Sequence, residues 1–245
     1  MVHRLARELA RPGLVARLTS LCRSVDGRLV FTTSFGLEDQ AITHAIFEAG
    51  ADSRIDLVTL DTGRLFPETY DVWARTEERY GRRIAAVVPQ QASLEALVAE
   101  QGINGFRQSV AARMACCSVR KVEPLRRALA GAAAWITGLR AEQSLNRARV
   151  AVVEPDETHG LIKVNPLADW NRQDLHRYVV DNDIPYNALH DRGYPSIGCA
   201  PCTRAVRVGE PERAGRWWWE QEMKKECGLH LRPPANQEHA DAEPV

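Results

Sequence analysis

The sequence lacks an excess of charge of either sign. Its 32 Lys and Arg residues balance 32 Asp and Glu residues, so the formal net charge is zero. A broad electrostatic surface for nucleic acid or for a membrane is therefore not expected, and any anion site must be local. The chain also lacks an apolar run near the length of a membrane span, about 18 residues. We therefore expect neither nucleic-acid nor membrane partners.

The N-terminus lacks an uninterrupted apolar stretch with a small-residue cleavage site, so no secretory signal is expected. Residues 1–23 are rich in arginine and contain a single acid, Glu8, as organellar transit peptides can be. The break at Arg11-Pro12-Gly13 favours an ordinary amphipathic helical hairpin instead. The expected compartment is the cytoplasm.

Lysine is scarce, with four residues against 28 arginines. Three of the four stand near cysteines: Lys121 follows the pair at 116 and 117, and Lys224 and Lys225 precede Cys227. This pattern favours a compact ammonium group over a guanidinium beside these thiols.

The six cysteines are not expected to form disulfides in a reducing compartment, so their spacing indicates metal binding or catalysis. Cys116 and Cys117 form one pair, at the start of a helix-like stretch, and Cys199 and Cys202 form another, in a loop. Adjacent side chains on a helix diverge by about 100°, which suits a bulky multi-iron cluster better than a single zinc ion. A [4Fe-4S] cluster is the favoured interpretation; structural zinc and unligated core cysteines are the alternatives. Cys22, alone among apolar residues, is interpreted as a core residue.

Cys227 differs from these cysteines because no other cysteine lies near it in the sequence. Lys224, Lys225 and His230 supply positive potential, which lowers the pKa of a thiol and raises its thiolate fraction. Local chemistry alone leaves two readings open, a catalytic nucleophile and an incidental thiol.

Short apolar runs alternate with helical patterns along residues 25–165. Strands are expected at 28–34, 55–60, 84–88, 135–137 and 161–164, and helices from about 38, over 67–80, and over 94–101 with Ser93 as its cap. This alternation predicts an α/β fold with a doubly wound, mostly parallel sheet, which binds ligands beyond the carboxyl ends of its strands. Ser34, Asp61 and Arg140 should meet at that edge.

The pattern changes after Pro166. A helix is expected over 170–180, followed by a Gly- and Pro-rich loop with two cysteines and an aromatic cluster at 217–219. We interpret residues 166–231 as a C-terminal cysteine-bearing appendage on the nucleotide-binding core, within one domain of residues 1–231. Residues 232–245 are polar and contain prolines, and we predict a disordered tail there.

Six segments together form a specific set: TSFGLED at 33–39, LDTGRLFPETY at 60–70, Cys116-Cys117 with Lys121, TGLR at 137–140, Cys199 with Cys202, and ECGLH at 226–230. In these segments the chain resembles the assimilatory sulfonucleotide reductases, specifically the bacterial adenylyl-sulfate (APS) reductases that use thioredoxin. The matching segments span residues 33–230, nearly the whole chain.

The resemblance implies an adenine nucleotide alpha hydrolase-like fold and a [4Fe-4S] cluster on Cys116, Cys117, Cys199 and Cys202. It also implies that the Cys227 thiolate attacks the sulfur of APS, releases AMP and leaves an S-sulfocysteine. Reduced thioredoxin would then free sulfite, a step of sulfate assimilation toward cysteine. The oligomeric state is not decided by the sequence, which is compatible with a homo-oligomer.

The resemblance assigns the anionic group of the substrate to five basic residues: Lys121, Arg140, Arg213, Arg216 and His230. Ser34, Gly36, Asp61 and Thr62 lie at strand ends, where turn amides and hydroxyls can receive the nucleotide. The alternative for these four is a role as turn residues and helix caps. The alternative for Arg213 and Arg216 is a solvated surface charge.

Three rival functions remain open. A reductase of 3′-phosphoadenylyl sulfate (PAPS), or of both substrates, would share the fold and nucleophile, but family members restricted to PAPS typically lack both cysteine pairs. An ATP pyrophosphatase-type enzyme would usually carry S-G-G-x-D-S where this chain has SFGLED at 34–39. A non-enzymatic iron-sulfur protein would keep the cluster ligands but have no use for ECGLH.

Overall fold

One six-stranded sheet organises the molecule, with strand order β3-β2-β1-β4-β6-β5. The computed structural model describes residues 1–10, 13–220 and 229. The strands are β1 (Arg28–Thr33), β2 (Ile55–Leu60), β3 (Ala85–Val87), β4 (Ala132–Ile136), β5 (Val153–Asp156) and β6 (Leu161–Val164). All neighbouring strands pair in parallel except β5, which runs antiparallel to β6 at one edge. The predicted mostly parallel sheet is confirmed.

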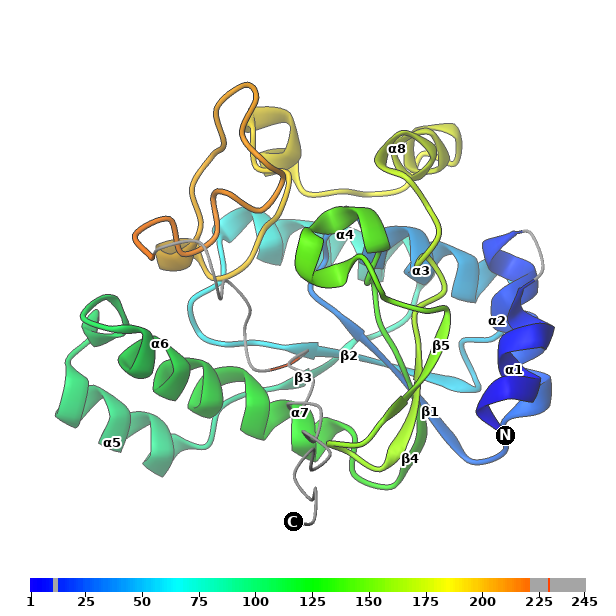
Figure 1. Ribbon diagram of the computed structural model, residues 1–245, viewed down its shortest axis with the longest axis horizontal. Helices are drawn as coiled ribbons and strands as arrows, with labels where there is room; N and C mark the ends of the chain where they lie inside the picture. The colour runs from blue at the N-terminus through cyan, green and yellow to red at the C-terminus, as the bar shows by residue number, and fades with distance from the viewer. Residues whose placement is uncertain (11–12, 221–228, 230–245) are drawn as a thin grey trace, which may run out of the picture.

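Helices cover both faces of the sheet (Figure 1). The α-helices are α1 (Val2–Leu9), α2 (Leu14–Ser24), α3 (Leu37–Glu48), α4 (Pro67–Tyr80), α5 (Gln91–Gln101), α6 (Val110–Cys117), α7 (Glu123–Ala128) and α8 (Arg172–Asp181). Short helical turns are η1 (Gly105–Arg107), η2 (Ser118–Val122), η3 (Ala141–Gln143), η4 (Leu145–Arg147), η5 (Ala188–Arg192) and η6 (Ala200–Cys202). No described helix is long and apolar enough to cross a membrane.

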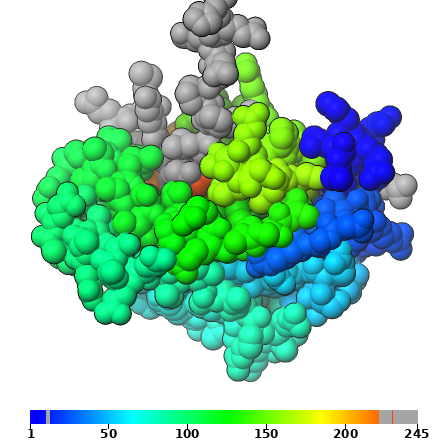
Figure 2. All heavy atoms as spheres, turned by 90° about the horizontal axis from the view of Figure 1, so that it is seen from below, coloured from blue at the N-terminus to red at the C-terminus, as the bar shows by residue number. Residues whose placement is uncertain are grey.

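The two faces of the sheet follow from the alternation of side chains along each strand. In β1, Leu29 and Phe31 pack into the main apolar cluster, to which α1, α2, α3 and α8 contribute. Val30, between them, packs with Trp135 and Leu125 in a smaller cluster on the α7 side. Figure 2 shows this second side, with the α5–α7 region in green and the N-terminal helix in blue at the far edge.

The strand order reverses beside β1, because the chain moves from β1 to β2 and β3 on one side and returns to β4 on the other. A doubly wound sheet binds ligands at such a reversal, where the loops after adjacent strands diverge. The loop after β1 begins at Ser34, and the loop after β4 begins at Thr137. These two loops therefore border the expected ligand site.

Three details differ from the sequence predictions. Helix α5 begins at Gln91 with Gln90 at its N-cap, so Ser93 lies within the first turn and is not the cap. Cys116 and Cys117 end α6, whereas the sequence placed them near the start of a helical stretch. The antiparallel edge strand β5 was not predicted, because its sequence VEPD has neither an apolar run nor a regular alternation.

The predicted N-terminal hairpin corresponds to α1 and α2; residues 11 and 12 of its break lie outside the described residues. Cys22 is half-buried and packs against the main apolar cluster, as expected. The predicted disordered tail at 232–245 also lies outside the described residues.

Arg17 ties the hairpin to the segment that follows β6. Its guanidinium donates to both carboxylate oxygens of Asp169 and to the carbonyl oxygen of Pro166, each at 2.6 Å. The Arg17 side chain is 5% exposed, so its charge depends on these acceptors. The hydrogen bond from Arg17 also lowers the pKa of Asp169.

We expect Asp169→Asn to lower the free energy of unfolding by about 1–3 kcal/mol at neutral pH, because a hydrogen-bonded charge pair is lost. Since the pKa of Asp169 is depressed in the folded state, this loss should be full above the unfolded pKa of about 3.9 and should shrink as the pH falls below it. Urea unfolding at several pH values measures the effect. Asp71→Asn, in the exposed Arg75–Asp71 pair, is the control and should cost under about 1 kcal/mol. Equal losses in the two variants would contradict the role of Arg17.

Candidate functional site

A cavity of about 190 Å³ opens at the strand reversal, between the loops after β1, β2 and β4 and the segments around residues 195–198 and 212–216. Six residues that the sequence assigned to substrate binding line it: Ser34, Gly36, Thr62, Lys121, Arg213 and Arg216. The structure therefore brings together residues that are up to 182 positions apart, from Ser34 to Arg216.

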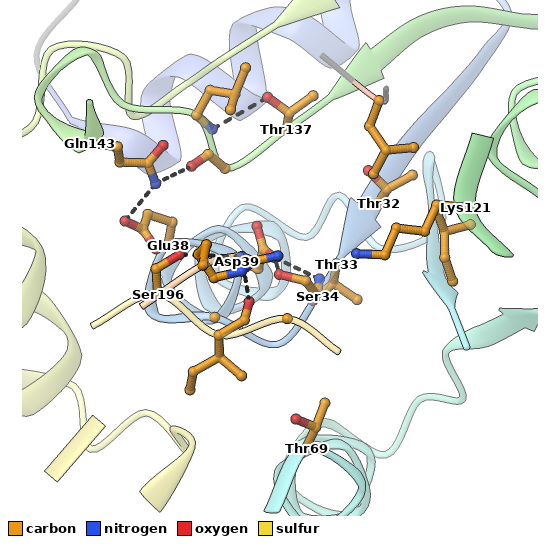
Figure 3. Close-up of a pocket in the computed structure, with 18 of the residues that line it drawn as sticks. Thr32, Thr33, Ser34, Glu38, Asp39, Thr69, Lys121, Thr137, Gln143 and Ser196 are labelled. Carbon is orange, nitrogen blue, oxygen red and sulfur yellow. Dashed lines mark hydrogen bonds between the residues drawn. The ribbon is translucent and has the colours of Figure 1, made fainter. Parts of the chain in front are cut away.

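The floor of this cavity is the loop from Ser34 to Gly36. Both the backbone N–H and the hydroxyl of Ser34 donate to the Asp39 carboxylate, at 2.6 and 2.7 Å. Gly138 packs so closely on this loop that a Cβ there would lie 2.2 Å from Asp39 Oδ1, so the close approach requires glycine. Figure 3 shows Ser34 and Asp39 together, with Glu38 beside them.

Two carboxylates follow one another at the start of α3, Glu38, which is partly buried, and Asp39, which is buried, and their pKa values move in opposite directions. Burial raises the pKa of Asp39 to about 6, although the hydrogen bonds from Ser34 oppose the shift. Burial also acts to raise the pKa of Glu38, but the guanidinium of Arg140, 2.8 Å away, and the Gln143 side chain outweigh it, so the pKa of Glu38 is lowered. Asp39 is thus the carboxyl group of this wall that can take up a proton near neutrality.

Lys121 enters the cavity from the other side. It lies in η2, a π-helical turn between α6 and α7, four positions after Cys117. Figure 3 shows its ammonium group directed toward Thr33 and Ser34. A single-turn π-helix within a longer helix changes the direction of the following side chains, and such turns are frequent at functional sites.

A second cavity, of about 20 Å³, is lined by the four paired cysteines. Cys116 and Cys117 reach it from the end of α6, and Cys199 and Cys202 from the loop around η6. Among the described residues, the basic side chains that line it are Arg64, Arg113, Arg120, Lys121 and Arg216, and the aromatic ones are Phe106 and Trp217. The two predicted pairs therefore meet in one place.

Several buried N–H donors around the second cavity have no hydrogen-bond partner within the described part of the chain: Arg120 Nε, Arg216 Nε and Trp217 Nε1. Buried donors usually have an acceptor, so this set fits an anionic sulfur-rich group in the cavity. In residues 1–10, 13–220 and 229, no three His, Cys, Asp or Glu side chains are placed to hold one metal ion.

The thiols of the second cavity differ in acidity. Burial raises the pKa of Cys116, and burial together with the nearby Cys199 raises the pKa of Cys202 to about 12. Burial also acts to raise the pKa of Cys199, but Lys121 and the Thr62 hydroxyl, 3.3 Å from its sulfur, lower it below the ordinary value. The cations thus favour the thiolate of Cys199 over those of Cys116 and Cys202.

The two cavities adjoin, because Lys121, Cys199 and Arg216 line both. Arg216 is buried over the ring of Trp217, 4.9 Å from its centroid, and donates to the Ser196 hydroxyl. The Arg216 guanidinium packs directly against Gly198, where a Cβ would lie 2.2 Å from Arg216 Nη2. The glycine before Cys199 therefore makes room for a cation that serves both cavities.

Two predicted substrate-binding residues are not among those that line the first cavity. The carboxylate of Asp61 accepts hydrogen bonds from the Gly63 N–H and the Tyr70 hydroxyl, at 2.9 and 2.8 Å. Asp61 therefore stabilises its own turn, which was the alternative to nucleotide binding. Arg140 is 1% exposed, and its guanidinium binds the carboxylates of Glu38, Glu142 and Glu212.

Cys227 and His230 lie outside the described residues. Leu229, between them, is described and lines the first cavity.

Sequence reasoning did not single out several residues of the site. Thr137, Gln143 and Arg147 line the first cavity, and Arg113 and Arg120 line the second. Arg120, which donates to the Thr62 carbonyl at 2.6 Å, had one available signal, its position beside Lys121. Arg113 had none, because one arginine among 28 carries no pattern.

Asp39 makes the stability of the protein depend on pH. Its folded-state pKa of about 6 lies above the unfolded value of about 3.9, so the folded state loses stability as the pH rises from 4 to 7. Asp39→Asn removes this titration. We expect the stability of the variant relative to the original chain to rise by up to about 3 kcal/mol over that interval. Urea unfolding at half-unit pH steps measures it, and a difference that is constant with pH would contradict the expectation.

Comparison with known proteins agrees with this geometry. The family model described as the phosphoadenosine phosphosulfate reductase domain matches residues 28–205. The adenosine 5'-phosphosulfate reductase of Sinorhizobium fredii (strain USDA 257) is 55% identical, over 91% of this chain and 88% of its own length. The relative of the same name from Agrobacterium fabrum is 56% identical, with 91% and 85% covered, and that from Burkholderia cepacia is 49% identical, with 91% and 92% covered.

Solved structures with a similar fold include a reductase of the same kind. The phosphoadenylyl-sulfate (PAPS) reductase of Candida auris, in a phosphate complex, aligns with a TM-score of 0.69 at 28% identity, over 84% of this chain and 96% of that one. The FMN adenylyltransferase of Candida glabrata, with a TM-score of 0.50 at 13% identity over 95% and 85%, shares the fold alone. The predicted adenine nucleotide alpha hydrolase-like fold is confirmed. By its family match and its identity to these relatives, the chain belongs to the phosphoadenosine phosphosulfate reductase domain family, with the proteins named adenosine 5'-phosphosulfate reductases.

Proposed function

We propose that this chain reduces adenylyl sulfate (APS) to sulfite and AMP, with thioredoxin as the electron donor and Cys227 as the nucleophile. The observation that carries the proposal is the junction of two cavities through Lys121, Cys199 and Arg216. One cavity lies where a doubly wound sheet receives a nucleotide, and the other gathers four thiols among cations. The identity of about 55% to proteins named adenosine 5'-phosphosulfate reductases supports the substrate.

The first cavity suits an adenine nucleotide that carries an anionic group. Ser34, Gly36 and Thr62 supply turn amides and hydroxyls at the ends of β1 and β2. Lys121, Arg213 and Arg216 supply positive charge on the walls. Negative charge grows on the phosphate oxygen as the S–O bond of APS breaks, so these cations stabilise the transition state more than the ground state. We assign them to the phosphosulfate group, together with His230.

Cys227 is assigned as the nucleophile through its sequence neighbour Leu229. Leu229 lines the nucleotide cavity and packs against both the Trp135 cluster and the Trp217 cluster. Cys227 stands two residues before Leu229 in the sequence, within the ECGLH segment at 226–230 that the resemblance ties to the nucleophile.

The reaction balances in three steps. The Cys227 thiolate forms an S–S bond to the sulfonate of APS, the S–O bond to phosphate breaks, and AMP leaves with that electron pair. A thioredoxin thiolate then attacks the Cys227 sulfur and expels sulfite, which leaves a mixed disulfide. The second thioredoxin thiol resolves this disulfide and regenerates the Cys227 thiolate. The dithiol of thioredoxin thus supplies both electrons.

Cys116, Cys117, Cys199 and Cys202 would hold a [4Fe-4S] cluster, for which the unpartnered N–H donors of Arg120, Arg216 and Trp217 are suited. The bound cluster would supply fixed charge beside Lys121 and would join the end of α6 to the loop around η6. We favour this electrostatic and structural role over electron transfer, since four protein ligands leave no open iron. Free thiols and a thioredoxin donor suit a cytoplasmic enzyme.

PAPS remains the second candidate substrate, because the Candida auris enzyme of the same fold is a PAPS reductase. The two cysteine pairs, which the resemblance ties to APS, and the lower identity of 28% to that enzyme favour APS. The ATP pyrophosphatase alternative is less favoured, because the loop at 34–39 lacks the paired glycines of a pyrophosphate cradle.

Mass spectrometry after mixing the reduced protein with APS alone tests the nucleophile. We expect one added SO₃ group, located on Cys227, and one AMP released per chain, because the second step requires thioredoxin. Cys227→Ser should form no adduct and release no AMP. Cys22→Ser, a matched control outside both cavities, should behave like the original chain. Sulfite production by Cys227→Ser at the full rate would refute the proposal, and a clear preference for PAPS in kcat/KM would overturn the choice of substrate.

The junction between the cavities generates a second prediction. Lys121→Arg keeps the charge but places a wider, planar group where both cavities meet, so we expect kcat/KM for APS to fall at least about tenfold. Arg127→Lys, in an exposed pair on α7, is the control and should change kcat/KM less than about twofold. Steady-state sulfite production with thioredoxin measures both. Full activity of Lys121→Arg would show that the compact ammonium is not needed.

A further inference from the structure

A buried ion pair joins the cysteine-bearing helix to the end of the continuously described chain. Arg113, in α6, donates through Nε to the Glu220 carboxylate at 2.5 Å. Their side chains are 1% and 6% exposed, so neither charge is balanced by water. Breaking such a pair by removal of one partner leaves an uncompensated buried charge. The contact is thus a rigid connection between two segments that are 107 residues apart in sequence.

Arg113 faces the second cavity as well as Glu220. Its guanidinium lies over the ring of Trp217, 4.7 Å from the centroid, and it lines the cavity with Cys117, four positions further along α6. Burial acts to lower the pKa of Arg113, but Glu220 and Cys117 more than offset this effect and raise the pKa. The cavity wall and the carboxylate of Glu220 therefore share one cation.

Glu220 stands immediately before residues 221–228, the segment that contains Cys227. On the far side of that segment, Leu229 packs against the Trp217 cluster and the Trp135 cluster. The two ends of the segment are thus attached to the molecule by different means, an ion pair at Glu220 and apolar contacts at Leu229. Of these two attachments the ion pair is the more directional, because a guanidinium donates hydrogen bonds to a carboxylate in only a few geometries.

We propose that Arg113 and Glu220 are positioning residues that set the point from which the Cys227 segment starts, relative to the cavity of the four cysteines. Neither residue lines the nucleotide cavity. The helix that ends in Cys116 and Cys117 is thereby joined to Glu220, the residue from which the chain leads on to Cys227. The inference rests on the proposed function, because it takes Cys227 as the nucleophile.

The experiment measures three quantities in each variant and in the original chain. They are the rate at which SO₃ appears on Cys227 at saturating APS, the APS concentration that gives half of this rate, and the content of iron and labile sulfide per chain. In the loaded enzyme, Glu220→Gln keeps the shape of the side chain but removes its charge. We expect the maximal rate to fall at least about tenfold, since small misplacements of a reacting group cost such factors. The half-saturating APS concentration should change less than about threefold, because neither residue lines the nucleotide cavity.

Iron and sulfide should remain at the level of the original chain. Glu123→Gln, in the exposed Arg127–Glu123 pair, is the matched control and should leave all three quantities unchanged. A full rate of SO₃ transfer in Glu220→Gln, with iron retained, overturns the inference. Loss of iron also overturns it, because the pair would then hold the sulfur cavity and not the Cys227 segment.

A double variant keeps the test decisive if Glu220→Gln does not fold. Arg113→Met with Glu220→Leu fills the same space without buried charge, a change that such sites often tolerate. We expect slow SO₃ transfer in this folded variant also, because the directional contact is gone; the full rate would overturn the inference. If the original chain itself forms no adduct on Cys227, the proposed function fails, and that result is distinct from every outcome above.

Discussion

The rest of the site depends on the burial of positive charge beside sulfur. Arg113, Arg120, Lys121 and Arg216 line the cavity that contains the four paired cysteines, and three of these four side chains are almost fully buried. A buried cation is tolerated only if an anion or an acceptor meets it. The protein meets this requirement with Glu220 for Arg113 and with the Thr62 carbonyl for Arg120, and the thiols complete the set.

The same constraint explains why the first cavity, proposed for the nucleotide, adjoins the second cavity, which the four paired cysteines line. Lys121 and Arg216 line both cavities, so an anion bound in either cavity would stabilise them. The π-helical turn that carries Lys121 follows directly after Cys117, so one local irregularity of the α6 to α7 helix directs a thiol to one side and an ammonium to the other. An uninterrupted α-helix would have continued the side-chain spacing of α6.

Much of the fold was predictable because it follows from periodicity and strand ends. The parallel strands read as apolar runs, and the positions of Ser34 and Thr62 followed from the rule that loops at the carboxyl ends of parallel strands meet. Other details were not predictable. The VEPD strand takes its conformation from pairing with β6. Helix α5 begins at Gln91 without a side-chain cap hydrogen bond from Gln90, so the local cap signal at Ser93 did not mark its start.

The sequence by itself determined the family, the sheet and which four cysteines form the two pairs, because these depend on residue type and spacing. Only the tertiary structure decided how the charges are used. Arg140, which looked like a cation for the substrate, is enclosed by Glu38, Glu142 and Glu212, while Arg113, which had no sequence signal, lies between Glu220 and the cysteines. The physical reason is that the role of a charged side chain is set by its neighbours within a few ångströms, and the decisive ones here, Glu38, Glu212 and Glu220, come from segments more than 60 residues away.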